Sequence, residues 1–262
     1  MNIELKTFSG LTAGDVRYIE AFTIPQLNRT RKIWIYLPPE YSQGDSKFPV
    51  IYMHDGQNLF SPDTAYSGHW AVSDSLERLC SAGETRGAIV VGIESDAHRE
   101  TELVTLTDDC ERYLQFIVTT LKPYIDSNFR VLPWRESTAI MGSSYGGQTA
   151  IFAALKHPEI FGLVGAFSPS WHVTAAVVAE YAKQYPIKYF ICAGAVEGEW
   201  VARNILRNYT PGFTPNYKLV AQALEAQGQE VRLDVDDYGA HIEQYWARKF
   251  PQAYQYLFPT NK

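Results

Sequence analysis

Two adjacent serines lie between glycines in the stretch IMGSSYGGQ, residues 140–148, and only one fits the pattern Gly-x-Ser-x-Gly. Ser144 has Gly142 two residues before it and Gly146 two residues after it, whereas Ser143 has Met141 in place of the first glycine. In this pattern a nucleophilic serine stands in a strained turn between a strand and a helix, where larger flanking side chains would collide. The spacing therefore predicts that Ser144 is a nucleophile at a helix N-terminus, where backbone N–H groups point at a developing oxyanion.

A serine hydroxyl needs a base to take its proton and a third group to orient that base. Of the six histidines, only His241 follows the last predicted strand, in the short turn DYGAHIEQYW ahead of the closing helix. His172 precedes any strand that could carry the acid, and His157 precedes Pro158 at a helix end. We expect both to be surface or pocket-wall residues, and we predict that His241 is the base.

The orienting carboxylate should follow the strand KYFICAG, and the next residues, AGAVEGEW, offer Glu197 and Glu199. Glu197 is the preferred candidate because it is closer to the end of the strand. Asp236 and Asp237 follow the next strand and stay open as alternatives. The sequence thus predicts a Ser-His-Glu triad.

The elements that would position these residues alternate along the chain. Two alternating segments, 16–24 and 31–38, predict an antiparallel pair. Continuous apolar runs, typical of strands buried on both faces, follow at 49–54, 87–93, 137–142, 162–168, 188–194 and 230–236. Stretches of helical period lie between or after them at 71–82, 108–126, 145–156, 173–185, 215–227 and 242–257. This order predicts one α/β domain over residues 1–262: a mainly parallel sheet, led by antiparallel strands, with helices on both faces.

Composition excludes several classes of protein. The formal charge is −6 and no basic cluster occurs, which argues against nucleic-acid binding. No run of eighteen apolar residues predicts a membrane span, and the start, MNIELKTFSG, lacks the apolar stretch of a secretory signal. Three widely spaced cysteines show neither a disulfide pattern nor metal-ligand spacing. We therefore expect a cytoplasmic protein with free thiols that needs no metal or organic cofactor.

Several side chains near the predicted catalytic loops are candidates for substrate binding. Aromatic rings there can stack on an aryl acyl group or a sugar: Tyr66, Trp70, Trp171, Trp200 and Tyr238. Arg99 and Arg203 are candidates for holding an anionic substrate such as a catecholate. Of these, Trp70, Trp171, Trp200 and Arg99 form the predicted substrate-binding set. The segment 207–218, rich in Pro, Gly and Asn, predicts a surface loop that overhangs the site.

From about residue 30 to the end, the chain resembles the putative-esterase family of α/β-hydrolases, which includes enterochelin-type siderophore esterases, feruloyl and acetyl esterases, esterase D and mycolyltransferases. The matching pieces, in order, are YLPPEY (36–41), FPVIYMHDGQNLF (48–60), GSSYGG (142–147), HPEIFG with FSPSW (157–171) and YGAHIEQYW (238–246). The resemblance implies an oxyanion hole formed by the backbone N–H groups of Gln57, in HDGQ, and Tyr145. Relatives often carry methionine at position 145, and they carry an aromatic residue at the position of Trp171.

The leading hypothesis is a serine ester hydrolase that forms an acyl-enzyme and acts on a small-molecule ester. A siderophore trilactone esterase and a carbohydrate feruloyl or acetyl esterase compete within this class, and the cytoplasmic expectation favours the first. A carboxylesterase or thioesterase fits the same residues, as does an acyltransferase whose acceptor alcohol outcompetes water. A non-catalytic binding protein is disfavoured because Ser144, His241, Gly142 and Gly146 are all present.

Overall fold

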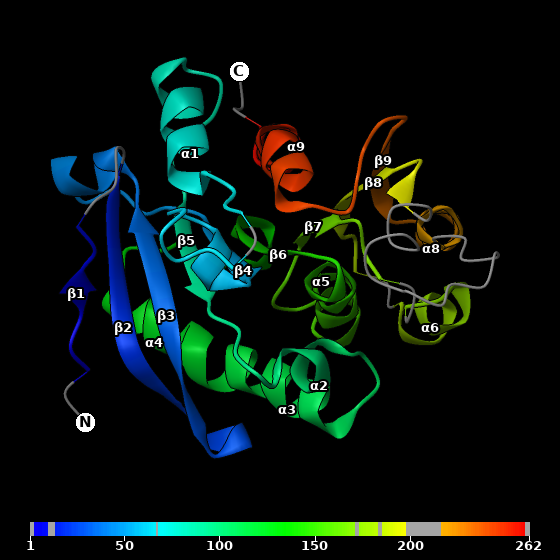
Figure 1. Cartoon of the computed structure of the whole chain (residues 1–262), viewed down its shortest axis with the longest axis horizontal. Coiled ribbons are helices and arrows are strands. Elements are labelled where there is room, and N and C mark those ends of the chain that lie inside the picture. The colour runs from blue at the N-terminus through cyan, green and yellow to red at the C-terminus, as the bar shows by residue number, and fades with distance from the viewer. Residues whose placement is uncertain are drawn as a thin grey trace.

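The computed structural model describes residues 3–9, 14–66, 68–170, 173–182, 185–197 and 216–259. Within these residues, nine strands form a single twisted sheet in the order β1-β2-β3-β5-β4-β6-β7-β8-β9 (Figure 1). The strands are β1 (Lys6–Thr7), β2 (Asp15–Ile24), β3 (Arg29–Leu37), β4 (Val50–His54), β5 (Ile89–Ile93), β6 (Thr138–Ser143), β7 (Leu163–Phe167), β8 (Lys188–Gly194) and β9 (Glu230–Asp236).

The sheet is parallel from β5 to β9, while β1, β2 and β3 lead into it as antiparallel strands. Val50 of β4 lies opposite Ile89 of β5 on one side and Thr138 of β6 on the other. The carboxyl ends of β4, β6, β7 and β8 therefore meet at the same edge of the sheet, where ligands bind in open α/β sheets. The predicted mixed sheet is confirmed.

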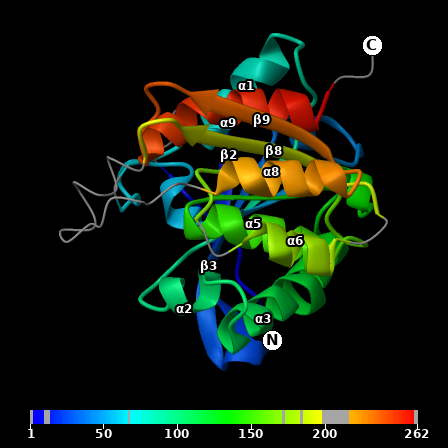
Figure 2. The ribbon, with the colours of Figure 1, turned by 90° about the vertical axis from the view of Figure 1, so that its right-hand side faces the viewer.

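Helices cover both faces of the sheet (Figures 1 and 2). Two of them, α1 (Val72–Ser81) and α9 (Glu243–Leu257), lie on one face. The other face carries α3 (Asp108–Phe116), α4 (Lys122–Asn128), α5 (Tyr145–Lys156), α6 (Ala175–Tyr181) and α8 (Tyr217–Ala226), with α2 (Arg99–Leu103) beside α3.

The strands bury alternate side chains in two separate cores. Val50 and Tyr52 of β4 belong to the cluster under α3 and α5, whereas Ile51 and Met53 belong to the cluster under α1 and α9. All four side chains are fully buried. A strand with two buried faces has no need of polar residues, which explains why it reads as a continuous apolar run.

Two details of the helices differ from the sequence prediction. The helix expected over 108–126 contains a π-helical turn, Ile117–Leu121, between α3 and α4. Pro123, just after this turn, has no N–H to continue the i→i−4 ladder. The five-residue helix α2 was not predicted, because so short a segment carries no readable helical period.

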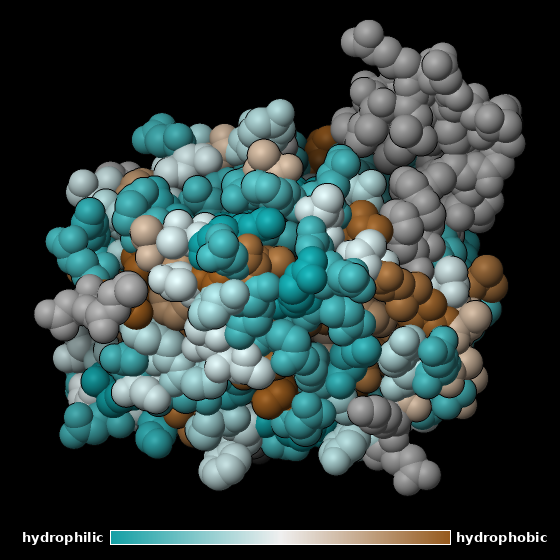
Figure 3. Space-filling model, turned by 90° about the horizontal axis from the view of Figure 1, so that it is seen from below, coloured by the Kyte–Doolittle hydropathy of each residue, from teal (hydrophilic) through white to brown (hydrophobic). Residues whose placement is uncertain are grey.

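The surface seen from the side of α3 is mainly hydrophilic, with apolar side chains in smaller patches (Figure 3). Among the helices that the structure describes, none combines the length and the apolar character that crossing a membrane requires.

Candidate active site

Ser144 stands at the junction of β6 and α5, between the last strand residue, Ser143, and the first helix residue, Tyr145. Its backbone has φ 55° and ψ −120°, a left-handed conformation that a non-glycine residue adopts only under strain. A Cβ at Gly142 would lie 2.8–3.0 Å from backbone atoms of Gly146. The glycine two residues before the serine is therefore required by the close approach of the strand to the helix.

The imidazole of His241 reaches Ser144 from the turn between β9 and α9. His241 Nε2 lies 2.9 Å from Ser144 Oγ, across 97 residues of sequence. On its other side, His241 Nδ1 lies 3.5 Å from Glu197 Oε2. The structure thus brings the three predicted residues together in the order hydroxyl, imidazole, carboxylate.

Glu197 follows β8 by three residues and is only 3% exposed. Burying a carboxylate is costly unless it is hydrogen-bonded, and here Oε1 accepts bonds from the backbone N–H of Gly194, at 2.7 Å, and from Ser168 Oγ. The alternative Asp236 instead pairs with Arg248 and Lys249, and Asp237 is exposed. Glu199 lies outside the described residues.

The two predicted oxyanion donors stand at the starts of two helices. Gln57 is in a one-turn 3-10 helix, Gly56–Asn58, directly after β4, and Tyr145 is the first residue of α5. N–H groups in the first turn of a helix point away from its body, toward whatever lies at its N-terminus. Ser144, Gln57 and Tyr145 all line one cavity of about 1100 Å³. The side chain of Gln57 is bonded to the loop after β5, because its Oε1 accepts a hydrogen bond from Ser95 N at 2.9 Å.

Arg99 also lines this cavity, but two of its nitrogens are bonded to Asp55. Nε and Nη2 lie 2.7 and 2.8 Å from the two carboxylate oxygens, and the guanidinium lies 5.7 Å from the centre of the Tyr145 ring. Burial alone would raise the pKa of Asp55, but neighbouring groups, Arg99 foremost among them, outweigh burial and hold that pKa below its ordinary value. Arg99 therefore braces the turn before Gln57 rather than standing as an uncommitted cation.

The other predicted substrate-binding residues have different fates. Trp70 does not line the cavity: it is 3% exposed, and its ring packs edge-on against Phe167 in the apolar core, with a centroid distance of 4.8 Å. Tyr66 does line the cavity, at its rim, whereas Tyr238 is 90% exposed and is not among the lining residues. Four further predicted residues and most of the predicted loop lie outside the described residues: Trp171, His172, Trp200, Arg203 and the segment 207–215. The end of that predicted loop, Tyr217 and Lys218, forms the start of α8 instead.

Several cavity residues were not predicted from the sequence. Trp246 lies on α9 in the piece YGAHIEQYW, and its ring stands edge-on to the His241 imidazole at 5.0 Å. The lining also includes the carboxylates Asp55, Glu94, Asp96 and Glu243. Trp246 could have been predicted from its place five residues after His241. The acidic lining could not, because its residues come from segments far apart in the chain.

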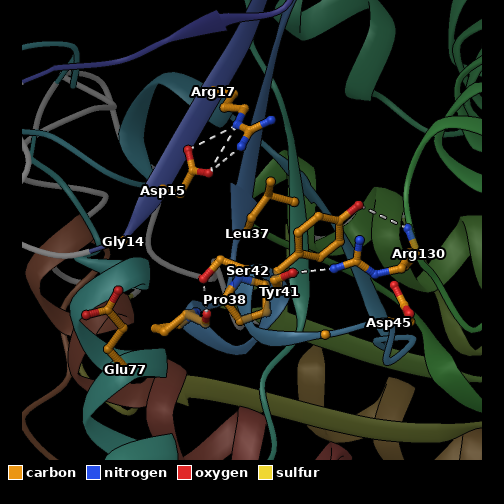
Figure 4. A pocket seen from close by; sticks show the side chains of 12 residues that line it. Gly14, Asp15, Arg17, Leu37, Pro38, Tyr41, Ser42, Asp45, Glu77 and Arg130 are labelled. Carbon is orange, nitrogen blue, oxygen red and sulfur yellow. Dashed lines mark hydrogen bonds and ion pairs between the residues drawn. The ribbon is translucent and has the colours of Figure 1, made fainter.

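A second cavity, of about 730 Å³, lies where β2 begins and β3 ends (Figure 4). Its cations are engaged within its own walls: Arg17 pairs with Asp15 at 2.6 Å, and Arg130 stacks 3.8 Å from the centre of the Tyr41 ring and donates to the Tyr41 carbonyl. None of the predicted catalytic residues lines it.

Comparison with known proteins identifies the family. The uncharacterized protein YbbA of Bacillus subtilis is 27% identical over 255 residues, which cover 88% of this chain and 94% of that protein. An S-formylglutathione hydrolase from Bos taurus is 30% identical over 158 residues, 55% of this chain and 53% of the relative. A solved ferulic acid esterase has a TM-score of 0.69 at 21% identity, over 94% of this chain and 98% of that one, which shows the shared α/β-hydrolase fold. Because the family model described as putative esterase matches residues 24–257, the chain belongs to that esterase family.

Proposed function

We propose that this protein is a serine ester hydrolase that works through an acyl-enzyme, with Ser144 as nucleophile, His241 as base and Glu197 as the acid that orients the imidazole. The observation that carries the proposal is the 2.9 Å approach of His241 Nε2 to Ser144 Oγ, with Glu197 Oε2 beside His241 Nδ1. A hydroxyl, an imidazole and a carboxylate in this order define the chemistry regardless of their spacing in sequence.

In the first half-reaction, Ser144 Oγ attacks the acyl carbonyl carbon while His241 Nε2 takes the hydroxyl proton. The carbonyl oxygen becomes an oxyanion, for which the backbone N–H groups of Gln57 and Tyr145 are the proposed donors. The imidazolium then gives its proton to the leaving alcohol as the carbon–oxygen bond breaks, and the acyl group stays on Ser144. The carboxylate of Glu197 stabilises the imidazolium throughout.

In the second half-reaction, water attacks the acyl-enzyme and gives its proton to His241, and the same oxyanion donors are used again. The imidazolium returns the proton to Ser144 Oγ as the acid leaves. Acyl transfer to an alcohol would use the same residues, with the alcohol in place of water. We propose water as the acceptor, and product analysis with an added alcohol tests this choice.

The cavity lining favours uncharged esters with an aryl or short acyl group. Tyr66 and Tyr145 supply aromatic surface, on which an aryl group can stack. Arg99 is the single cation among the described residues of the lining, and it is bonded to Asp55, while four carboxylates share the same walls. An anionic substrate such as a ferric catecholate siderophore would meet like charge there, so we rank a feruloyl-type or simple carboxylic ester above it.

We further propose a cytoplasmic location. Cys80, Cys110 and Cys192, all in the described part of the chain, form no disulfide. Unpaired cysteines are the usual state in a reducing compartment, which supports this proposal.

The function is tested by hydrolysis of p-nitrophenyl acetate and butyrate with the wild-type chain and the Ser144→Ala variant. We expect hydrolysis by the wild-type chain and a loss of at least a thousandfold in kcat for Ser144→Ala, as expected when a nucleophile is removed. A panel of methyl ferulate, S-formylglutathione and enterobactin then ranks the substrates, and product analysis with added glycerol detects acyl transfer. Activity retained by Ser144→Ala would refute the assignment.

A further inference from the structure

A second serine near the triad, Ser168, is held in a strained backbone at the end of β7. Its φ is 47°, and it is 2% exposed. Its N–H donates to Cys192 O at 2.7 Å, which ties it to β8, the strand that ends three residues before Glu197. Non-glycine residues persist in this conformation only where the surroundings enforce it, and such positions gather at functional sites.

The side chain of Ser168 lies between Trp246 and Glu197. Trp246 Nε1 donates to Ser168 Oγ at 2.7 Å, and Ser168 Oγ is also bonded to Glu197 Oε1. An indole N–H can only donate, so Ser168 Oγ is the acceptor toward Trp246. An ionised carboxylate can only accept, so the Ser168 hydroxyl proton points at Glu197. The chemistry of the two partners therefore fixes the direction of both hydrogen bonds.

These bonds leave a single carboxylate oxygen for the histidine. Glu197 Oε1 accepts from Ser168 Oγ and from Gly194 N, whereas Glu197 Oε2 lies 3.5 Å from His241 Nδ1. With Oε1 held by two donors, the carboxylate cannot rotate without losing them. Its Oε2 is thereby presented to the imidazole.

Trp246 contacts His241 directly and is linked to Glu197 through Ser168. Its indole N–H reaches Glu197 through Ser168, and its ring stands edge-on to the imidazole of His241 with centroids 5.0 Å apart. The residue is 4% exposed and packs beside Trp70 in the core under α9. A rigid aromatic anchor thus touches the base directly and the acid through one hydroxyl.

We propose that Ser168 and Trp246 are positioning residues of the ester hydrolysis, which together hold the Glu197 carboxylate and the His241 imidazole in the orientation that brings Glu197 Oε2 beside His241 Nδ1. The inference rests on the proposed function and deepens it. It gives a role to the first serine of FSPS and to the tryptophan of YGAHIEQYW, two residues that the triad itself leaves unexplained.

The test uses steady-state hydrolysis of p-nitrophenyl butyrate by Ser168→Ala and Trp246→Phe. Ser168→Ala should lower kcat on the order of ten- to a hundredfold with KM within about twofold, because small misplacements of catalytic groups act on the transition state. Trp246→Phe keeps an aromatic ring but removes the N–H together with the five-membered ring of the indole. The hydrogen bond to Ser168 and part of the packing beside His241 are then lost, so kcat should fall at least about threefold, and wild-type kcat in this variant would rule out a positioning role for Trp246. Ser168→Gly serves as a second variant in case Ser168→Ala folds poorly, because glycine adopts a positive φ without strain. It removes the same hydroxyl, so we expect the same fall in kcat.

A mutant cycle separates positioning from general damage. In a Glu197→Gln background, Ser168→Ala should change kcat by less than about twofold, because Ser168 acts only through the carboxylate. Wild-type kcat in both Ser168 variants would overturn the proposal. So would the full single-mutant loss reappearing in the Glu197→Gln background, because that would reveal a role independent of Glu197.

The matched control is Ser73→Ala, since Ser73 is a buried serine of α1 that does not line the cavity. We expect wild-type kcat and KM from it. Ser144→Ala distinguishes the two levels of the account: if it abolishes hydrolysis while the Ser168 variants remain fully active, only the positioning role fails. If Ser144→Ala stays active, the proposed function fails.

Discussion

His54 is a buried histidine directly behind the nucleophile turn. It is 2% exposed, and its Nδ1 lies 2.9 Å from Tyr113 Oη. A Cβ at Gly146 would come within 3.1 Å of His54 Cβ, so the side chain of His54 packs closely against the first turn of α5. Burial lowers the pKa of His54 to about 4. The residue is therefore neutral in the folded protein where the unfolded chain would already bind a proton.

We predict that His54 makes the fold sensitive to acid. The pKa of His54 in the folded protein lies below its unfolded value of about 6.5, so only the unfolded chain binds a proton as the pH falls from 6.5 toward 4. The free energy of unfolding is therefore unaffected by His54 above pH 6.5 and decreases over this range. Between pH 7 and pH 4.5 this amounts to about 2 to 3 kcal/mol. In His54→Leu the fall in the free energy of unfolding over this range should be smaller by that amount. Urea denaturation of both proteins at the two pH values measures it, and equal falls would contradict the prediction.

At the same scale, the sequence was sufficient for some residues and not for others. The flanking glycines of Ser144 predicted its place in a turn between a strand and a helix, and the structure has it there. The position of His241 after the last strand predicted its approach to Ser144, whereas the catalytic roles of both residues are proposals. The fate of Trp70 depended on Phe167 and Phe250, and that of Arg99 on Asp55, 44 residues away. Such partners are set by how strands align in space, and no local pattern in the chain records them.

Two elements meet without side chains between them where β8 ends. A Cβ at Gly194 would lie 1.9 Å from Gly239 O, in the turn that leads to His241. That turn is held by the N–H of Gly239 bonded to Asp236 O at 3.1 Å. The contact lets the end of β8, three residues before Glu197, approach the turn that leads to His241.

We predict that Gly194→Ala pushes this turn away and separates the triad. Overpacking of this kind costs about 1 to 3 kcal/mol of stability, and kcat should fall about a hundredfold because His241 moves. Thermal unfolding and p-nitrophenyl butyrate hydrolysis measure both effects. Gly44→Ala serves as control because a Cβ there would meet nothing within 4 Å. A Gly194→Ala variant with wild-type kcat would contradict the proposed contact.

The larger elements were readable from the sequence because burial on both faces imposes a simple pattern. The runs at 49–54, 137–142 and 188–194 became β4, β6 and β8 with shifts of at most one residue at either end. The two-residue strand β1 and the π-helical turn were missed. The first is too short to show alternation, and the second keeps the apolar spacing of the helix around it.

At the scale of the whole molecule, charge and cavity act in the same direction. The chain carries a formal charge of −6, and the described lining of the cavity that contains Ser144 and His241 holds four carboxylates and one arginine. A cleft lined by one sign of charge lowers the local concentration of ligands with that sign. The sequence predicted the net charge but not its concentration at the site, because the four carboxylates come from three separate parts of the chain: Asp55 follows β4, Glu94 and Asp96 follow β5, and Glu243 begins α9.

We therefore predict discrimination against anionic esters. The monoester of p-nitrophenol with adipic acid should have a kcat/KM about tenfold below that of p-nitrophenyl hexanoate at low salt, and the difference should shrink at high salt as charges are screened. Glu243→Gln should reduce the difference in kcat/KM between the two esters further, because it removes one negative charge from the cavity. Stopped-flow or plate-based hydrolysis assays at two ionic strengths measure the ratio. An anionic ester hydrolysed as fast as its neutral counterpart would argue instead for cations facing the substrate.

The most direct test of the account is the site at which a fluorophosphonate probe reacts. The proposed chemistry predicts one phosphonyl group per chain, located on Ser144 by fragment-ion sequencing of the peptide that also contains Ser143. Labelling should be lost in Ser144→Ala, strongly slowed in His241→Ala and retained in Ser143→Ala. A label on Ser143, or an inert wild-type protein, would contradict the central claim that the imidazole at 241 activates the hydroxyl at 144.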